Sequence, residues 1–129
     1  MVNTQSDERS TGMKLVTVTE ENGVVVVTPT VRRLDASVAP AFKQAVVAVV
    51  DGGKQRLVLD LAGVEFIDSS GLGAMVSILK ALGGKGAVGL CGAQGAVLAL
   101  FKLTRMDKVF TLFATRTEAI ASIGGRREG

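Results

Sequence analysis

The sequence predicts an α/β fold: a small, mixed but mostly parallel sheet of about four to five strands with four helices, in the order ββαβαβαβα. Two β-branched segments joined by Asn22-Gly23 predict an opening hairpin, because Asn-Gly is the strongest short hairpin signal. Apolar runs then alternate with segments of helical periodicity, and this alternation requires right-handed crossovers. The 129 residues, of which 47% are hydrophobic, are enough for one domain with a real core.

The first two strands follow from local patterning. Residues 14–20 alternate between two sets of side chains, which predicts an edge strand. Residues 24–28 form a continuous β-branched run, which predicts a more central strand. Pro29 is expected to end or bend this strand, because proline cannot donate to the hydrogen-bond ladder.

The first helix is expected after residues 31–37, with Asp35 or Ser37 as its N-cap. Pro40 is compatible with this helix if it falls in the first turn. The segment 51–53, Asp-Gly-Gly, is expected to end the helix. The predicted apolar face consists of Val38, Phe42, Ala45, Val46 and Val49.

A strand and a helix form the centre of the chain. A short apolar run with β-branched character, which predicts a buried strand, consists of Leu57, Val58, Leu59 and Leu61. Apolar residues then recur at i, i+3, i+4 and i+7, which predicts one apolar helix face. Between the two lies the segment 68–71, Asp-Ser-Ser-Gly, a cluster typical of a helix N-terminus. The predicted face consists of Leu72, Met75, Val76 and Leu79.

The second half continues the alternation after a break at residues 81–86. We expect a strand over 87–90, a helix over 93–103, a short strand around 108–110 and a last helix over 115–123. The apolar residues of these two helices are Val97, Leu100, Phe101 and Leu103 in the first and Ala119, Ile120 and Ile123 in the second. The domain is therefore expected to span residues 13–124, with a disordered tail over 1–12 and a flexible tail over 125–129.

The composition argues against most enzyme and metal chemistry. The chain has no histidine, the usual general base, metal ligand and pH switch. The single Cys91 cannot form an internal disulfide or a cysteine cluster for a metal, and we expect it to be a buried thiol in a reducing compartment. A net charge of +3 with scattered arginines does not indicate direct nucleic-acid binding. We find no signal peptide and no stretch suited to membrane insertion, so we expect a soluble, cytoplasmic protein.

Two catalytic motifs are each present only in part, because one required glycine is missing. Gly71 and Gly73 follow a strand and open a helix as in a dinucleotide fingerprint, but Val76 stands at the place of the third glycine. Ser69 lies at a strand-to-helix turn as in a nucleophile elbow, but Ile67 stands where a glycine is needed. Because the third glycine is missing, the sequence does not predict a dinucleotide site. Because no histidine can activate the serine, it does not predict a serine hydrolase.

The chemistry of a helix N-terminus suggests another use for this segment. A hydroxyl in the first turn is exposed, and a phosphate on it would be stabilised by free N–H groups and the helix dipole. The face that continues from Ser69 is small or polar, so another protein could approach closely. The alternative, which spacing alone favours, is that the polar residues of segment 68–70 are only caps. The face consists of Ser69, Gly73, Ser77 and Lys80.

The segment 66–73, Phe-Ile-Asp-Ser-Ser-Gly-Leu-Gly, resembles the signature of the STAS domain, specifically of bacterial anti-sigma factor antagonists. The resemblance extends roughly from Lys14 to Ile123 and is most specific at residues 68–73. It implies the STAS fold, and it implies that the first serine after the aspartate, Ser69, is the phosphorylation site. Physical reasoning alone does not separate Ser69 from Ser70 as the acceptor.

The resemblance also implies a mechanism, partner switching. The unphosphorylated chain would bind an anti-sigma factor serine kinase and release a sigma factor, and phosphorylation of Ser69 would abolish that binding. A serine phosphatase would reverse the reaction. ATP would belong to the kinase, so no cofactor is expected on this chain. Two alternatives remain open: a STAS interaction module that does not switch, and a sensor of a nucleotide or lipid at the glycine-rich turns 83–86 or 92–95.

One segment departs from the family pattern. Many antagonists carry Gly-Glu-Leu-Asp where residues 32–35 of this chain read Arg-Arg-Leu-Asp. The resemblance implies that Asp35 lies beside Ser69, and the basic residue Arg33 in place of an acidic one suggests a partner surface of opposite charge. The expected partner-binding residues are Arg33, Asp35, Asp68, Ser69, Ser70, Gly71, Gly73 and Ser77.

Overall fold

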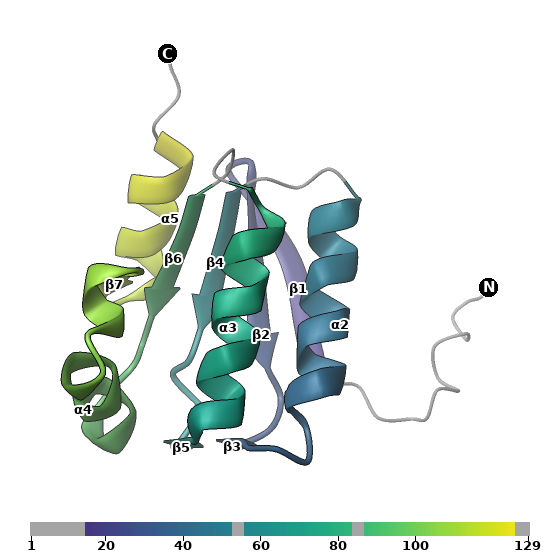
Figure 1. The fold of residues 1–129 in the computed structure, drawn as a ribbon. Coiled ribbons are helices and arrows are strands. Elements are labelled where there is room, and N and C mark those ends of the chain that lie inside the picture. The colour runs from purple at the N-terminus through teal and green to yellow at the C-terminus, as the bar shows by residue number, and fades with distance from the viewer. Residues whose placement is uncertain (1–14, 53–55, 84–86, 126–129) are drawn as a thin grey trace.

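A computed structural model describes residues 15–52, 56–83 and 87–125, and its main feature is a five-stranded sheet with strand order β1-β2-β4-β6-β7 (Figure 1). β1 pairs antiparallel with β2, and the other neighbouring strands pair in parallel. This arrangement confirms the predicted α/β class. The strands are β1 (Val16–Glu21), β2 (Val24–Pro29), β4 (Arg56–Asp60), β6 (Ala87–Cys91) and β7 (Thr111–Phe113).

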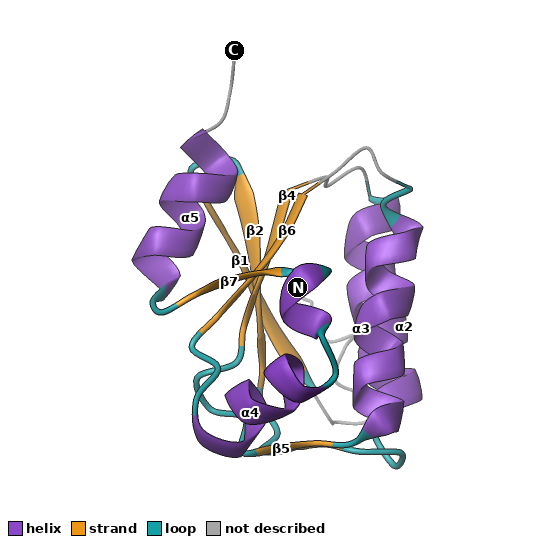
Figure 2. Cartoon of the chain, turned by 60° about the vertical axis from the view of Figure 1, so that its left-hand side comes forward, coloured by secondary structure: helices purple, strands orange, loops and turns teal. Residues whose placement is uncertain are grey.

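Helices cover both faces of the sheet. α2 (Ala39–Asp51) and α3 (Ser69–Ala81) lie side by side on one face, and α5 (Arg116–Gly125) lies on the opposite face (Figure 2). α4 (Gly95–Leu103) and the 3₁₀ helix η1 (Met106–Lys108) connect β6 to β7. The chain order therefore matches the predicted alternation. The ends of the predicted domain lie partly outside the described residues, as do most of the predicted tails.

The sheet divides the hydrophobic core into two clusters. On β2, Val25 and Val27 face the larger cluster under α2 and α3, while Val24 and Val26 face the smaller cluster under α5. Residues of β2 are thus buried on both faces, which explains why this strand is a continuous β-branched run instead of an alternating one.

A second, two-stranded sheet was not predicted. β3 (Arg33–Leu34) pairs in parallel with β5 (Phe66–Ile67) at the end of the molecule where α3 begins. A strand of two residues is too short to show a periodic side-chain pattern, so the sequence of neither segment indicated a strand.

The predicted strand at 108–110 is wrong. Residues 106–108 form η1, and the strand follows at 111–113, where Leu112 pairs with Leu90. Arg105, at φ 66°, enters the left-handed region before η1, and the amide of Phe110 donates to the carbonyl of Met106. Because of this turn, the strand begins at Thr111 and not near residue 108.

Of the apolar residues named for the third helix, Leu103 is not part of the core, because its exposed fraction is 82%. Leu103 is the last residue of α4, and its side chain lies off the face that carries the buried Val97 and Phe101. The helix begins at Gly95 and not at Ala93; Gly95 has a φ of +58°, outside the helical range.

The N-cap predicted for the first helix is wrong as well. α2 begins after Val38, which makes no side-chain capping bond, and Pro40 lies in the first turn as expected. The carboxylate of Asp35 instead accepts hydrogen bonds from the Ser37 amide at 3.1 Å and the Ser37 hydroxyl at 2.6 Å. Both candidate caps are therefore used in a turn that precedes the helix.

The core face of α3 is rotated from the prediction. Met75 is buried as expected, but Leu72, Val76 and Leu79 are only partly buried. Ala74 and Ile78 take the buried positions beside Met75. The partly buried residues pack along the edges of the larger cluster, where a helix that neighbours α2 also needs apolar side chains.

Candidate functional site

The candidate site is the first turn of α3. Asp68 is the N-cap, and its Oδ1 accepts a hydrogen bond from the Gly71 amide at 3.0 Å. This confirms the capping predicted from the cluster 68–71. The second carboxylate oxygen, Oδ2, accepts from the Ala36 amide at 3.3 Å, so one side chain joins the start of α3 to the loop before α2.

The backbone brings the two segments of the site together. β3 and β5 set Arg33 opposite Phe66 and Leu34 opposite Ile67. The amide of Asp68 donates to the carbonyl of Leu34 at 3.3 Å, which extends the pairing by one step. Asp35, the next residue along the chain, therefore lies beside Asp68, the residue that precedes Ser69.

Gly71 lies beneath this junction and is buried. A Cβ atom added to Gly71 would collide with the backbone carbonyl oxygen of Leu34 and would lie 2.8 Å from the Cγ2 atom of Ile67. The site therefore requires glycine at position 71 for close packing between α3 and the small sheet. Gly71 supports the site from below and presents little surface of its own.

The two serines lie above this packed base. Ser69 and Ser70 are the first two residues of α3, and both are exposed. Within the described part of the chain, neither hydroxyl makes a hydrogen bond. A hydroxyl in this position can take up a modifying group without breaking an interaction of the fold.

The other residues expected on the partner-binding face of α3, Gly73 and Ser77, differ in exposure. Gly73 is exposed, and a Cβ at this position would meet no atom within 4 Å. Ser77 is half-buried and, with Ser70 and Lys43, lines a shallow groove of about 360 Å³ between α2 and α3. Ser70 therefore faces this groove at one end of the exposed surface. The groove is also lined by Ala36, Ala39, Pro40 and Ala74.

Arg33 and Asp35 form a charged pair at the edge of the site. The Arg33 Nε atom lies 3.5 Å from Asp35 Oδ2, and the guanidinium lies 4.1 Å from the centroid of the Phe66 ring. Hydrogen bonds from Ser37, and then the nearby Arg33, hold the pKa of Asp35 below its ordinary value. Asp35 is therefore ionised at neutral pH, and Arg33 is already engaged by a carboxylate and a ring. Arg33 is thus not an isolated positive charge.

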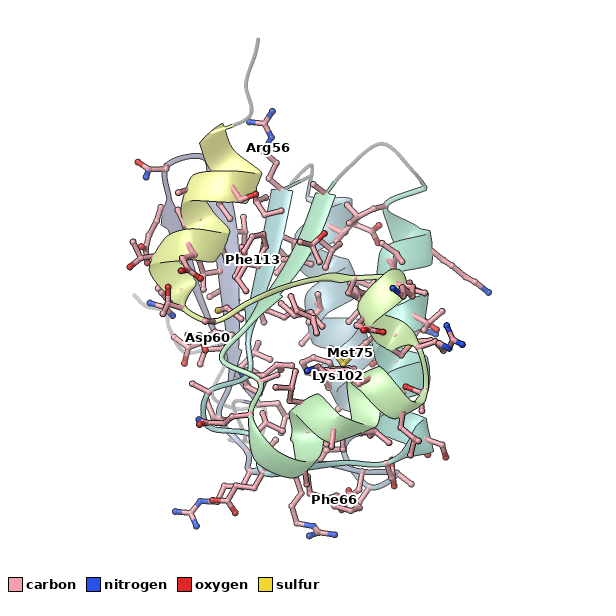
Figure 3. All side chains as sticks on the ribbon, turned by 90° about the vertical axis from the view of Figure 1, so that its left-hand side faces the viewer. Arg56, Asp60, Phe66, Met75, Lys102 and Phe113 are labelled. Carbon is pink, nitrogen blue, oxygen red and sulfur yellow. The ribbon has the colours of Figure 1, made fainter. Side chains whose placement is uncertain are left out.

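A second polar cluster lies at the start of α5. Arg116 donates from Nε to Asp60 Oδ2 at 3.2 Å, from one terminal nitrogen to Glu21 at 3.4 Å and from the other to the Thr28 hydroxyl at 3.0 Å. Figure 3 shows Asp60 at the end of β4, well separated from Phe66 at the lower end of the molecule. Asp60 and Asp68 therefore belong to different clusters, and no paired-carboxylate site results. No local sequence pattern pointed to Arg116, because its partners lie 56 to 95 residues away.

The remaining chemistry of the described residues is limited. Cys91 is buried, and burial, followed by the nearby Asp60 carboxylate, raises its pKa to about 12, so the thiol stays protonated. Over residues 15–52, 56–83 and 87–125, no three side chains of the histidine, cysteine, aspartate or glutamate type gather as metal ligands. In the same ranges no helix has the length and hydropathy needed to cross a membrane. Of the glycine-rich turns, Gly92 packs against the backbone of Ala62, and residues 84–86 lie outside the described part.

Comparisons with known proteins match nearly the whole described part of the chain. The STAS domain family matches residues 16–119. A Mycobacterium tuberculosis protein named anti-sigma-F factor antagonist RsfB is 31% identical over 112 residues, which cover 87% of this chain and 91% of the relative. The similarity therefore extends far beyond the segment around Ser69.

Solved structures agree with this assignment. An anti-sigma factor antagonist from Mycobacterium paratuberculosis is 33% identical, with a TM-score of 0.78 over 84% of this chain and 92% of that one. A STAS domain protein from Planctomyces limnophilus is 26% identical, with a TM-score of 0.76 over 84% and 96% of the two chains. The chain belongs to the STAS domain family, among the anti-sigma factor antagonists.

Proposed function

We propose that this chain acts as an anti-sigma factor antagonist by partner switching. In the unmodified state it binds an anti-sigma factor that is itself a serine kinase, and a sigma factor is released. The kinase transfers the γ-phosphoryl group of its own ATP to the Ser69 hydroxyl, which loses its proton, and ADP leaves. A serine phosphatase hydrolyses the phosphate ester and restores the binding state. The chain itself performs no catalysis in this cycle.

The observation that carries the proposal is the state of Ser69. Its hydroxyl is exposed at the first residue of a helix whose start is held by Asp68 and packed over Gly71. It makes no hydrogen bond to any described residue, so a kinase can reach it and the fold loses nothing when it is modified. The free N–H groups of the first turn and the positive end of the helix dipole support the added phosphate.

The same phosphate opposes binding of the partner. It adds ~1.5–2 negative charges at neutral pH. These charges lie one residue from Asp68, whose carboxylate is bonded to the Ala36 amide next to Asp35, on a surface that the partner must dehydrate. A coupling of about 3 kcal/mol between phosphorylation and binding would lower the affinity roughly a hundredfold. We expect this loss with little change in the fold.

The contact surface that we propose surrounds Ser69. Ser70, Gly73 and Ser77 give a side of α3 with small residues, where a partner can approach the helix closely. Arg33 and Asp35 extend this surface onto the end of β3, and Lys43 extends it onto α2. Gly71 contributes by shape alone, because it is buried.

The test is capture of the partner from native lysate with unmodified protein, Ser69→Ala and Ser69→Asp as baits. We expect the first two to recover an ATP-binding serine kinase and the third to recover at least tenfold less. The recovered kinase is then incubated with ATP and Mg²⁺ and each bait. Phosphate should appear on the unmodified protein and on a Ser70→Ala control, and it should be absent from Ser69→Ala.

The other outcomes select the alternatives. Equal recovery of one partner by all three baits would assign the chain to interaction modules that do not switch. Phosphate lost in Ser70→Ala and kept in Ser69→Ala would move the acceptor to Ser70. Recovery of no partner, together with a thermal shift on addition of GTP, ATP or a lipid mixture, would favour a ligand sensor.

A further inference from the structure

β1 is an open edge of the main sheet. Among the residues that the structure describes, it pairs with β2 alone, in six consecutive antiparallel steps with no bulge. Natural sheets usually protect such an edge with proline, charged side chains or a bulge. β1 has charged side chains only at its C-terminal end, Glu20 and Glu21, and the segment 16–19 carries none of these devices. This segment is therefore a template for another strand.

The hydrogen-bond register identifies which backbone groups point to this edge. The Thr30 amide donates to the Leu15 carbonyl at 2.8 Å, so Leu15 and Thr30 are a hydrogen-bonded pair. Because such pairs alternate along antiparallel strands, Thr17 also bonds to β2, whereas Val16 and Val18 direct their N–H and C=O groups away from it. The placement of Pro29 opposite Val16 agrees with this alternation, because proline has no N–H to donate.

An apolar notch lies directly beside this edge. Val18 is 45% exposed and lies on the α2 side of the sheet, because its cross-strand neighbour Val27 faces the larger core cluster. With Val25 and Val49 it lines a cavity of about 350 Å³ between β1 and the second half of α2. The cavity is completed by Thr19, Glu20, Ala48 and Gly52. A strand added to β1 would place alternate side chains over this notch.

We propose that the occupant is a second copy of the chain, with the two β1 strands antiparallel about a two-fold axis at Thr17. In this register, Val16 and Val18 of one copy lie opposite Val18 and Val16 of the other, and their outward N–H and C=O groups bond to each other. Each notch receives a valine of the other copy. The two sheets become one continuous sheet.

Charge and side-chain pairing select this register among the possible ones. The two Glu20 residues lie six positions apart along the paired strands, or roughly 20 Å, so the carboxylates do not repel strongly. Thr17 lies opposite Thr17 on the α5 side, and threonine pairs are favourable across strands. A register centred on Val18 would instead place Glu20 opposite Val16, with a carboxylate beside an apolar side chain. The interface uses none of the residues proposed to bind the anti-sigma factor, so it stands independently of that function.

Analytical ultracentrifugation of the full chain tests the proposal, over about 5 to 500 μM. We expect a monomer–dimer equilibrium for the unmodified protein and a dissociation constant at least tenfold weaker for Val18→Lys. Val109→Lys is a matched control, because Val109 is also 45% exposed but lies between η1 and β7. It should dimerise like the unmodified protein. A monomer at every concentration, or equal dimerisation of both variants, would overturn the inference.

Crosslinking tests the register and does not depend on the folding of Val18→Lys. Thr17 and Thr19 are both exposed, and the natural Cys91 is buried. Under mild oxidation, Thr17→Cys should give a disulfide-linked dimer, since its two copies face each other across the axis. Thr19→Cys should not, because its two copies are four positions apart. Equal crosslinking of the two variants would contradict the proposed axis.

Discussion

The starts of α3 and α5 are built from the same local device and used in opposite ways. At α3 the Asp68 carboxylate accepts from the Gly71 amide at 3.0 Å, and at α5 the Thr115 hydroxyl accepts from the Glu118 amide at 3.2 Å. The first residue after the cap differs. Arg116 is held by side chains from three strands, whereas the Ser69 hydroxyl has no partner in the described part of the chain.

The difference teaches how a reactive position can be placed on a rigid scaffold. At α5, the Arg116 side chain ties the first turn to the sheet through Asp60 and Thr28, so this side chain is occupied by the fold. At α3, close packing under Gly71 and the bridge from Asp68 to Ala36 hold the helix from below. The side chains above are therefore released from any structural role.

The largest expected effect is that of Gly71→Ala. The added methyl group would displace the Leu34 carbonyl or the Ile67 side chain, so we expect a loss of about 3 kcal/mol in the free energy of unfolding. Urea unfolding followed by circular dichroism measures it. A loss below ~1 kcal/mol would mean that α3 is not held by close packing, and the contrast with α5 would fail.

Arg116→Ala should come next. It removes hydrogen bonds to Asp60, Glu21 and Thr28, and because the side chain is 39% exposed, we expect a loss of about 1–2 kcal/mol in stability. Partner capture should be unchanged relative to the unmodified protein. Loss of capture with unchanged stability would show that the cluster at α5 takes part in binding.

The two caps offer a matched pair of variants. Asp68→Ala and Thr115→Ala should each lower the free energy of unfolding by about 1 kcal/mol, because each removes an N-cap bond. Asp68→Ala should also weaken partner binding, since the loop at Ala36 loses its bridge to α3. Titration calorimetry with the captured partner compares the two. Equal affinities would remove Asp68 from the binding surface.

Gly73→Ala should raise stability slightly, by about 0.5–1 kcal/mol, because alanine favours the helix and its Cβ meets no atom within 4 Å. Affinity for the partner should nevertheless fall, since the methyl group would stand on the face where a close approach is proposed. Thermal melting and titration calorimetry on one sample separate the two effects. A stabilised variant that binds normally would exclude Gly73 from the interface.

The smallest expected effect concerns pH. The pKa of Asp35 is lower in the folded chain than its ordinary value of 3.8, chiefly because Ser37 donates to it. Its contribution to stability is thus present above the ordinary pKa and is lost as pH falls through the folded value. Ser37→Ala should move the Asp35 pKa upward in an NMR titration. Ser77→Ala is the control and should leave it unchanged.

Local features of the fold were predictable from the sequence. The hairpin followed from Asn22 and Gly23, which take φ values of 54° and 77° as a tight two-residue turn requires. The cap at Asp68 was predictable because its partner is three residues away. Pairings between distant segments were not predictable: β3 with β5, Asp68 with Ala36, and Arg116 with its oxygens join residues 32 to 95 positions apart.

Two of the errors have a common cause. The helix cap assigned to Asp35 or Ser37 was displaced because the two residues bond to each other. The strand near 108–110 moved because Arg105 adopts a left-handed conformation that favours a tight turn. In each case a polar or backbone interaction within a turn competed with the regular element that the side-chain pattern indicated.

Gly71 and Ser69 are two positions apart and are constrained by separate requirements. Gly71 is constrained by close packing, so a side chain at this position lowers the stability of the fold. The Ser69 side chain is exposed and bonds to no described residue, so the fold does not require serine at this position. In a lineage that no longer needs the modification, other residues can replace it. The scaffold can therefore outlive its regulation, and descendants without a serine at this position would inherit an intact domain ready for a different use.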